Sequence, residues 1–333
     1  MMKNHRKIIR YALFMAGVLL VFSVVLSVLW SSSAFLKHNK AVEGLPQPVL
    51  YEGKHYEYKE ELINILCLGI DHDEALDKDV LPGERGQSDA IFLISLNSNT
   101  REMKILNIPR DLMMPVKVYD VNGDLAAIQS MQIALQYAYG SDERDSCLKT
   151  AEDISALLLD IPIHRYCAIN FNAVSALNDA VGGVSVQMDS EYVDAALQMT
   201  DPLFVPGDKV HLMGEHCFHY LHIRDIHAYA SCEERAGRQK QYIKGYVEAA
   251  KEKIRKDKRL LPKLYSILDD NMTTDIRKIE LPSFPLYIEN MDFDDAVRTI
   301  EGTRIQGEVH EEFYPDEDEL HKTVVEMFYT LQD

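Results

Sequence analysis

Long apolar runs separated by short polar stretches divide the chain into predicted strands and helices. A nearly continuous apolar run at 63–71, INILCLGID, is typical of a central strand that is covered on both faces. Two further strands are predicted at 89–97 and 102–109, and the polar stretch SNT between them indicates a hairpin. Apolar residues at helical spacing predict helices at 128–139 and 147–159.

The second half of the chain continues this alternation of strands and helices. Strands are predicted in HRYCAINF and GGVSVQM, with a helix at 173–181 between them that Asn172 caps. Further helices are expected at 215–222 and 233–258, and the terminal helix in DEDELHKTVVEMFYTL begins with an acidic first turn. The alternation favours an α/β fold with a central mixed β-sheet flanked by helices.

An uncharged, largely apolar stretch near the N-terminus predicts a transmembrane helix at 11–30, which is long enough to cross a bilayer. The sequence SSSA that follows also fits a signal-peptide cleavage site, but signal-peptide cores are shorter. Basic residues before the span favour a cytoplasmic N-terminus and an extracytoplasmic body; they are Lys3, Arg6, Lys7 and Arg10. The expected organisation is a cytoplasmic tail at 1–10, the span, a juxtamembrane linker at 31–60 and a folded domain at 61–333.

Composition narrows the function classes. The net charge of −18, from 35 basic and 53 acidic residues, disfavours binding to nucleic acid. The five cysteines lack CxxC spacing, so no zinc site of that kind is predicted, and Cys67 is expected to be a small buried apolar residue. Five histidines show no metal-ligand spacing with cysteines or acids: His72, His164, His216, His219 and His227. His72, which lies beside Asp71 and Asp73, is expected to be a surface histidine.

Acidic residues stand where the first two predicted strands meet. Asp71 ends the first strand and Asp89 begins the second, so the two carboxylates are expected at one edge of the sheet. Carboxylates that close together repel each other unless a cation lies between them, and ligation by oxygen alone suits Mg²⁺. Two solvated loop acids are the structural alternative.

Arginines supply the opposite charge. Arg110 follows the third strand in NIPRD, and Arg235 lies in the first turn of the helix at 233–258, where the helix dipole attracts anions. Arg224 lies just upstream, and Gln239 shares the helix face of Arg235. Because guanidinium groups bind phosphate oxygens in pairs, these residues around a metal predict a pyrophosphate clamp.

Two structural questions accompany this prediction. Tyr242 and Tyr246 are expected to continue the helix face of Arg235. Asp111 follows Arg110 directly, so a purely structural ion pair between these neighbours is the alternative to an anion site.

The segments SDAIFLISLNSNTREMKILNIPRDLMMPV, NDAVGGVSV and IRD…ERAGRQKQ, in this order behind one N-terminal span, resemble the LytR–CpsA–Psr family. The resemblance extends over most of 61–330. It implies an α/β sandwich whose hydrophobic pocket holds a lipid tail, in a protein of the cell membrane. It also implies an Mg²⁺- or Mn²⁺-dependent phosphotransferase that moves a glycopolymer from a polyprenyl-pyrophosphate lipid to peptidoglycan during cell-wall assembly.

The resemblance also implies a role for each matching charged residue. Asp71 and Asp89 would bind the metal, and the pyrophosphate would be bound by Arg110, Arg224, Arg235, Arg238 and Gln239. Asp89, Arg110 and Arg235 would be catalytic, with Asp89 as the base for the acceptor hydroxyl. Asp111 is a weaker candidate for the base and is expected instead to orient Arg110.

The chain departs from the family pattern at three positions. Gln87 stands where arginine is usual, with Arg85 two residues earlier, His222 replaces the first arginine of an Arg-x-Arg pair, and Cys232 replaces an aspartate. Transfer, hydrolysis of the lipid pyrophosphate, and non-catalytic sensing of a lipid-linked polymer therefore all stay open. A cytoplasmic tail of about 10 residues is too short for a DNA-binding domain.

Overall fold

The computed structural model describes residues 45–70, 81–170, 172–190, 193, 195–223, 231–257, 259–269, 271–276, 296–307 and 310–332. The chain divides into two compact units. The described residues of the first, the helical unit, belong to Ile169–Met272. Those of the second, the sheet unit, belong to Trp30–Ala168 and Thr273–Asp333.

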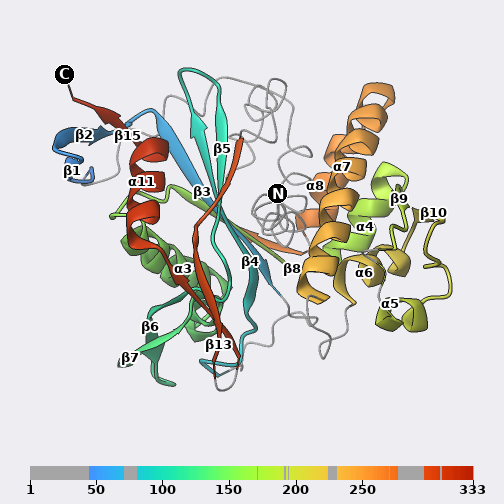
Figure 1. The fold of residues 1–333 in the computed structure, drawn as a ribbon, viewed down its shortest axis with the longest axis horizontal. Coiled ribbons are helices and arrows are strands. Elements are labelled where there is room, and N and C mark those ends of the chain that lie inside the picture. Colours follow the sequence, from blue (N-terminus) through green and yellow to red (C-terminus); the bar gives the residue numbers. More distant parts are fainter. Residues whose placement is uncertain are drawn as a thin grey trace. The chain divides into compact units, whose positions relative to one another are not determined.

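A six-stranded sheet confirms the predicted mixed α/β architecture (Figure 1). Its strand order is β11 (Met272–Thr274), β8 (Arg165–Asn170), β3 (Leu62–Ile70), β4 (Ser88–Asn97), β5 (Met103–Asn107) and β12 (Val297–Thr299). The pairs β3–β4 and β4–β5 are antiparallel, whereas β5 and β12 run parallel. The turn at SNT joins β4 to β5, as the sequence predicts.

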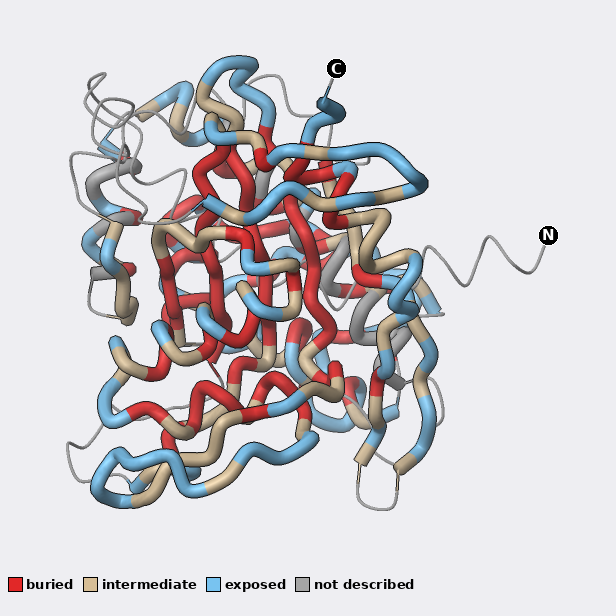
Figure 2. Tube along the Cα trace, turned by 90° about the vertical axis from the view of Figure 1, so that its left-hand side faces the viewer, coloured by how far each residue is buried: buried red, intermediate tan, exposed pale blue. Residues whose placement is uncertain are grey.

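The centre of the sheet is buried on both faces. Every residue of β3 is buried, and Figure 2 shows the central strands as continuous buried segments. Leu66 and Leu68 belong to the core formed with α3 (Glu143–Leu157) and α11 (Glu317–Phe328). Cys67 points to the other face because successive strand residues alternate, and its thiol is buried as predicted.

Several predicted boundaries are wrong. The linker predicted at 31–60 contains β1 (Val49–Tyr51) and β2 (Lys54–Tyr58), which form a sheet with β15 (Tyr329–Leu331). The helix predicted at 128–139 begins only at Ile133, as the 3₁₀-helix η2 (Ile133–Tyr139). The residues before it belong to β7 (Leu125–Gln132), which pairs with β6 (Met113–Tyr119). Near the C-terminus, β13 (Gly302–Gln306) and β14 (Glu311–Pro315) form a hairpin.

The helical unit agrees closely with the sequence predictions. Its helices are α4 (Asn172–Val181), α5 (Ala195–Thr200), α6 (Glu215–His222), α7 (Ser231–Lys256) and α8 (Leu260–Asp269). The hairpin of β9 (Val184–Gln187) and β10 (Lys209–Leu212) completes it. Helix α6 has the predicted bounds, and α7 begins and ends two residues before its prediction.

The thiols of Cys67, Cys147, Cys167 and Cys217 are free and buried. Among the helices of the described residues, none combines the length and apolar character that crossing a membrane requires. The span predicted at 11–30 lies outside those residues.

His164 links β3 to the start of β8 and gives the sheet unit a pH dependence. Its Nδ1 accepts a 3.0 Å hydrogen bond from the backbone N–H of Asn64, and burial together with the charge of Arg165 lowers the pKa of His164 to about 4. The unfolded chain binds this proton near pH 6.5, so the stabilisation is complete above that pH and disappears as pH falls toward 4. As pH falls from 6.5 to about 4, the free energy of unfolding of the wild type should decrease by roughly 3 kcal/mol through this group. We expect His164→Gln not to show that decrease. Urea denaturation at several pH values measures this, with exposed His55→Gln as the control; parallel profiles for the wild type and His164→Gln would contradict it.

Candidate active site

Strand register brings Asp89 and Arg110 together. In the antiparallel pair of β4 and β5, Phe92 lies opposite Asn107. Asp89 stands three residues before Phe92, and Arg110 stands three residues after Asn107, so continuing the register puts them opposite each other. Their side chains form an ion pair, and the Nη2 of Arg110 donates a 2.9 Å hydrogen bond to the Oε1 of Gln87.

The backbone around Arg110 is fixed while its side chain reaches solvent. The carbonyl of Arg110 accepts a 3.1 Å hydrogen bond from the N–H of Ala134, and the N–H of Leu112 donates to the carbonyl of Pro109 over 3.0 Å. The side chain of Arg110 is 37 % exposed and that of Asp89 is 21 % exposed. Because a guanidinium carries five N–H donors, Arg110 can bind an anion without releasing Asp89.

The second predicted metal-binding acid, Asp71, lies outside the described residues. Ile70, the last described residue before Asp71, pairs with Ser88, which precedes Asp89. The meeting of the two carboxylates at one sheet edge stays a prediction. Carboxylate oxygens are suitable ligands for Mg²⁺, so the residue types present fit the predicted cation.

Asp111 has a different partner from the one expected. Its carboxylate is 8 % exposed and forms an ion pair with Arg304 of β13, while its carbonyl accepts a 2.9 Å hydrogen bond from the N–H of Phe313. Arg304 also lies 3.8 Å from the carboxylate of Glu311 and packs over the ring of Phe313. The prediction that Asp111 orients Arg110 is therefore wrong. The two charged residues of NIPRD have different ion-pair partners: Arg110 pairs with Asp89, and Asp111 pairs with Arg304 of β13.

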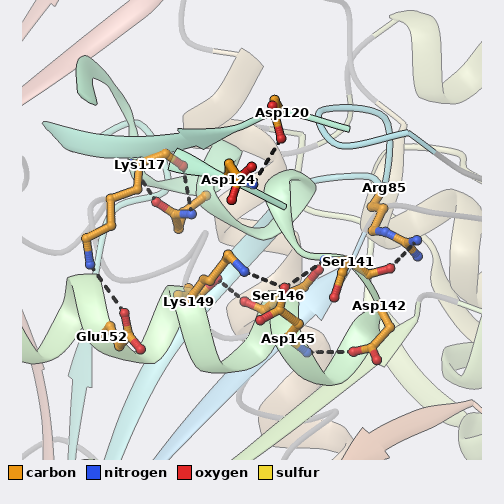
Figure 3. Close-up of polar contacts among 12 residues, drawn as sticks. Arg85, Lys117, Asp120, Asp124, Ser141, Asp142, Asp145, Ser146, Lys149 and Glu152 are labelled. Atoms are coloured by element: carbon orange, nitrogen blue, oxygen red, sulfur yellow. Dashed lines mark hydrogen bonds and ion pairs between the residues drawn. The ribbon is translucent and has the colours of Figure 1, made fainter. Parts of the chain in front are cut away.

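Arg85 does not take the place of the missing arginine at position 87. It is buried, and its Nη2 donates a 2.6 Å hydrogen bond to the carbonyl of Ser141 (Figure 3). Ser141 precedes α3, whose N-cap Asp142 accepts a 2.7 Å hydrogen bond from the N–H of Asp145. Arg85 thus fixes the chain at the start of α3.

The helical unit contains the remaining predicted arginines. Arg224 lies outside the described residues, and so do the side chains of Arg235 and Gln239 on α7. Arg238 is fully buried, and its guanidinium donates to the carbonyls of Tyr220 and Ile223 at the end of α6. The prediction that Arg238 binds pyrophosphate is therefore wrong, because these backbone contacts give it a structural role.

The buried face of α7 also differs from the prediction. Tyr242 and Tyr246 are each 2 % exposed, and the Tyr242 hydroxyl donates a 3.0 Å hydrogen bond to the Oδ1 of Asn178. These tyrosines therefore follow Arg238 at helical spacing along the core face of α7 and do not extend an exposed anion-binding face.

Arg238 offers a direct test of this structural assignment. We expect Arg238→Met to lower the free energy of unfolding by about 2 kcal/mol, because it removes hydrogen bonds from a charged donor to buried carbonyls. The exposed Lys244 on the same helix provides the control, since Lys244→Met should change that free energy by less than about 0.5 kcal/mol. Urea denaturation measures both variants, and equal stabilities would contradict the assignment.

Comparison with known proteins agrees with this fold. The model of the LytR_cpsA_psr family matches residues 28–327. A teichoic acid transferase of Bacillus cereus, TagU, is 30 % identical over 166 residues, which are 50 % of this chain and 45 % of that protein. TagV of Bacillus subtilis, also named a teichoic acid transferase, is 25 % identical over 169 residues, or 50 % of this chain and 39 % of TagV. These matches thus span less than half the length of either relative.

The crystal structure of Bacillus subtilis TagV has a related fold. It aligns with a TM-score of 0.57 over 80 % of this chain and 97 % of the TagV chain, at 23 % sequence identity. The likeness supports the mixed α/β fold.

Proposed function

The chain belongs to the LytR–CpsA–Psr family, and we propose that it transfers a glycopolymer from a polyprenyl-pyrophosphate lipid to peptidoglycan. One observation carries this proposal. Arg110 is held by Asp89 and Gln87 at the end of two core strands, yet its guanidinium remains partly exposed. A fixed, accessible cation on an acidic protein is suited to a local anionic substrate group.

The proposed reaction is a displacement at phosphorus. The oxygen of a peptidoglycan hydroxyl attacks the phosphorus that carries the polymer, and the bond from that phosphorus to the bridging oxygen of the pyrophosphate breaks. The polymer becomes linked by a phosphodiester, the lipid leaves as polyprenyl phosphate, and the hydroxyl proton passes to a base. Arg110 stabilises the negative charge that develops on the phosphate oxygens.

The ion pair with Arg110 bears on the role of Asp89. The carboxylate of Asp89 already pairs with the guanidinium of Arg110, so we propose that Asp89 holds Arg110 and a cation rather than acting as the general base. We propose that Asp71 and Asp89 hold Mg²⁺ or Mn²⁺. When bound, the cation would neutralise charge on the phosphates.

Gln87, which stands where the family pattern has arginine, makes a contact that an arginine could not make. Its side-chain oxygen accepts a hydrogen bond from Arg110, which an arginine at this position cannot do because a guanidinium has no acceptor. Another departure, His222, stacks on Phe218 with ring centroids 5.0 Å apart. We propose that Arg110, held by Asp89 and Gln87, does alone in this chain what arginines at positions 87 and 110 do together in the family pattern.

The predicted span and its basic flank support a location for this reaction. We propose a single-pass membrane protein with residues 1–10 in the cytoplasm, a helix at 11–30 and the folded units outside. This arrangement gives the domain access to lipid-linked polymer and to peptidoglycan.

The full-length protein in detergent tests the proposal. It is incubated with a polyprenyl-pyrophosphate oligosaccharide, peptidoglycan and Mg²⁺, and the released polyprenyl phosphate and the peptidoglycan-bound sugar are measured. Transfer predicts both products, and metal removal should stop both. Lipid phosphate without bound sugar would indicate a hydrolase, whereas lipid binding without either product would indicate a sensor; each result would refute transfer.

A further inference from the structure

Two histidines and one aspartate gather at one point of the helical unit, contrary to the sequence prediction that His216 and His219 have no metal-ligand arrangement. We propose that Asp201, His216 and His219 form a binding site for a divalent transition metal, with Zn²⁺ as the favoured ion. The proposal does not depend on the proposed transfer reaction. Its ligands belong to the helical unit, whereas Asp89, which we propose to hold Mg²⁺, belongs to the sheet unit.

Helix geometry brings the two imidazoles together. His216 and His219 are three residues apart on α6, so their side chains lie on the same helix face. Both direct Nδ1 toward one oxygen, the Oδ2 of Asp201, which His216 contacts closely and His219 approaches to 3.4 Å. One nitrogen from each histidine and one carboxylate oxygen therefore lie within 4.8 Å of one another.

The carboxylate of Asp201 is held in place for this role. It follows α5 directly, and its side chain is 4 % exposed. The other oxygen, Oδ1, accepts a 3.0 Å hydrogen bond from the N–H of Leu203, and the carbonyl of Asp201 accepts one from Phe204. The carboxylate thus presents Oδ2 to the two rings.

The donor set determines the class of metal. Two imidazole nitrogens and one carboxylate oxygen are a common catalytic-type set for Zn²⁺, whereas Mg²⁺ prefers oxygen ligands and waters. Ligands at 2.0–2.2 Å around a tetrahedral ion lie roughly 3.3 Å from each other. The 3.4 Å between His219 Nδ1 and Asp201 Oδ2 already matches that spacing. The imidazole of His216 is 48 % exposed, so an ion can enter from solvent.

The same three side chains also fit a simpler arrangement, in which the histidines only donate hydrogen bonds to Asp201. The two arrangements differ in one measurable way. Imidazoles that only donate hydrogen bonds need no ion, whereas a metal site must bind one equivalent of Zn²⁺ and lose it when any one ligand is removed.

Metal titration of the full-length protein in detergent, after removal of metal by EDTA and dialysis, distinguishes them. We expect one equivalent of Zn²⁺ by calorimetry, displacement of bound Co²⁺ with loss of its visible absorption, and an increase in melting temperature that EDTA reverses. Mg²⁺ in large excess should not compete.

Three variants make the test specific. We expect His219→Gln and Asp201→Asn each to weaken Zn²⁺ binding at least about a hundredfold. His219→Gln retains the contact between His216 and Asp201, so it should keep the metal-free melting temperature of the wild type. His211→Gln, an exposed histidine of the same unit, should bind Zn²⁺ as the wild type does. Failure of the wild type to bind, or equal binding by all variants, would overturn the proposal.

Discussion

Replacing Arg110 with alanine is expected to lower kcat/KM for polymer transfer by about 10²–10³-fold, with no loss of folded protein. At the candidate active site, Asp89 and Gln87 hold the guanidinium of Arg110 in place. Loss of one preorganised donor to a developing oxyanion has an effect of this size. The side chain is 37 % exposed and the backbone hydrogen bonds of residue 110 do not need it, so stability should change little.

Two further variants make this result specific to the cluster. Arg110→Lys keeps the charge but loses the paired donors, so we expect a kcat/KM between those of the wild type and of Arg110→Ala. Arg144, an exposed arginine of the same unit, provides the matched control, and Arg144→Ala should transfer polymer as the wild type does. Wild-type transfer by Arg110→Ala, in protein with an unchanged melting temperature, would remove Arg110 from the mechanism.

Replacing Arg304 with methionine is expected to lower the free energy of unfolding by about 3–5 kcal/mol. The partner carboxylate of Asp111 is only 8 % exposed, so the variant leaves a buried charge without its ion-pair partner. The Cζ of Arg304 lies 5.2 Å from the centre of the Phe313 ring, and methionine can pack on the same ring in its place. Urea denaturation measures the loss.

Arg298, on β12, offers a matched control for this effect. It pairs with Glu326, and both side chains are more than 40 % exposed, so Arg298→Met should cost less than about 1 kcal/mol. Adding Asp111→Asn to Arg304→Met should recover part of the lost stability, because the unpaired charge is then removed as well. If Arg304→Met costs no more than Arg298→Met, the buried ion pair is not a main support of the NIPRD turn.

The local sequence pattern predicts the central sheet well. An apolar run such as 63–71 has few alternatives to a buried strand, and β3 differs from that prediction by one residue at each end. Long-range pairing is not visible in the same way. The short strands β1 and β2 look like linker because their partner, β15, lies at the other end of the chain. Residues 128–132 fit helical spacing, but pairing with β6 makes them a strand.

The candidate site shows the same limit. Strand ends point to Asp89 and Arg110, and the register of β4 and β5 explains why the two side chains meet. The ion pair of Asp111 with Arg304 joins residues separated by 193 positions, which no local pattern reveals. In the helical unit, spacing alone could show that His216 and His219 share a helix face. Only the fold brings Asp201 to them.

The most direct test of transfer through Arg110 counts both products of one reaction. Full-length wild-type protein and Arg110→Ala are incubated with lipid-linked polymer, peptidoglycan and Mg²⁺, and polyprenyl phosphate and peptidoglycan-bound phosphodiester are quantified together. Transfer through Arg110 predicts equal amounts of the two products from the wild type and a loss of both in Arg110→Ala. Lipid phosphate that forms without the phosphodiester, or equal yields from the two proteins, would contradict it.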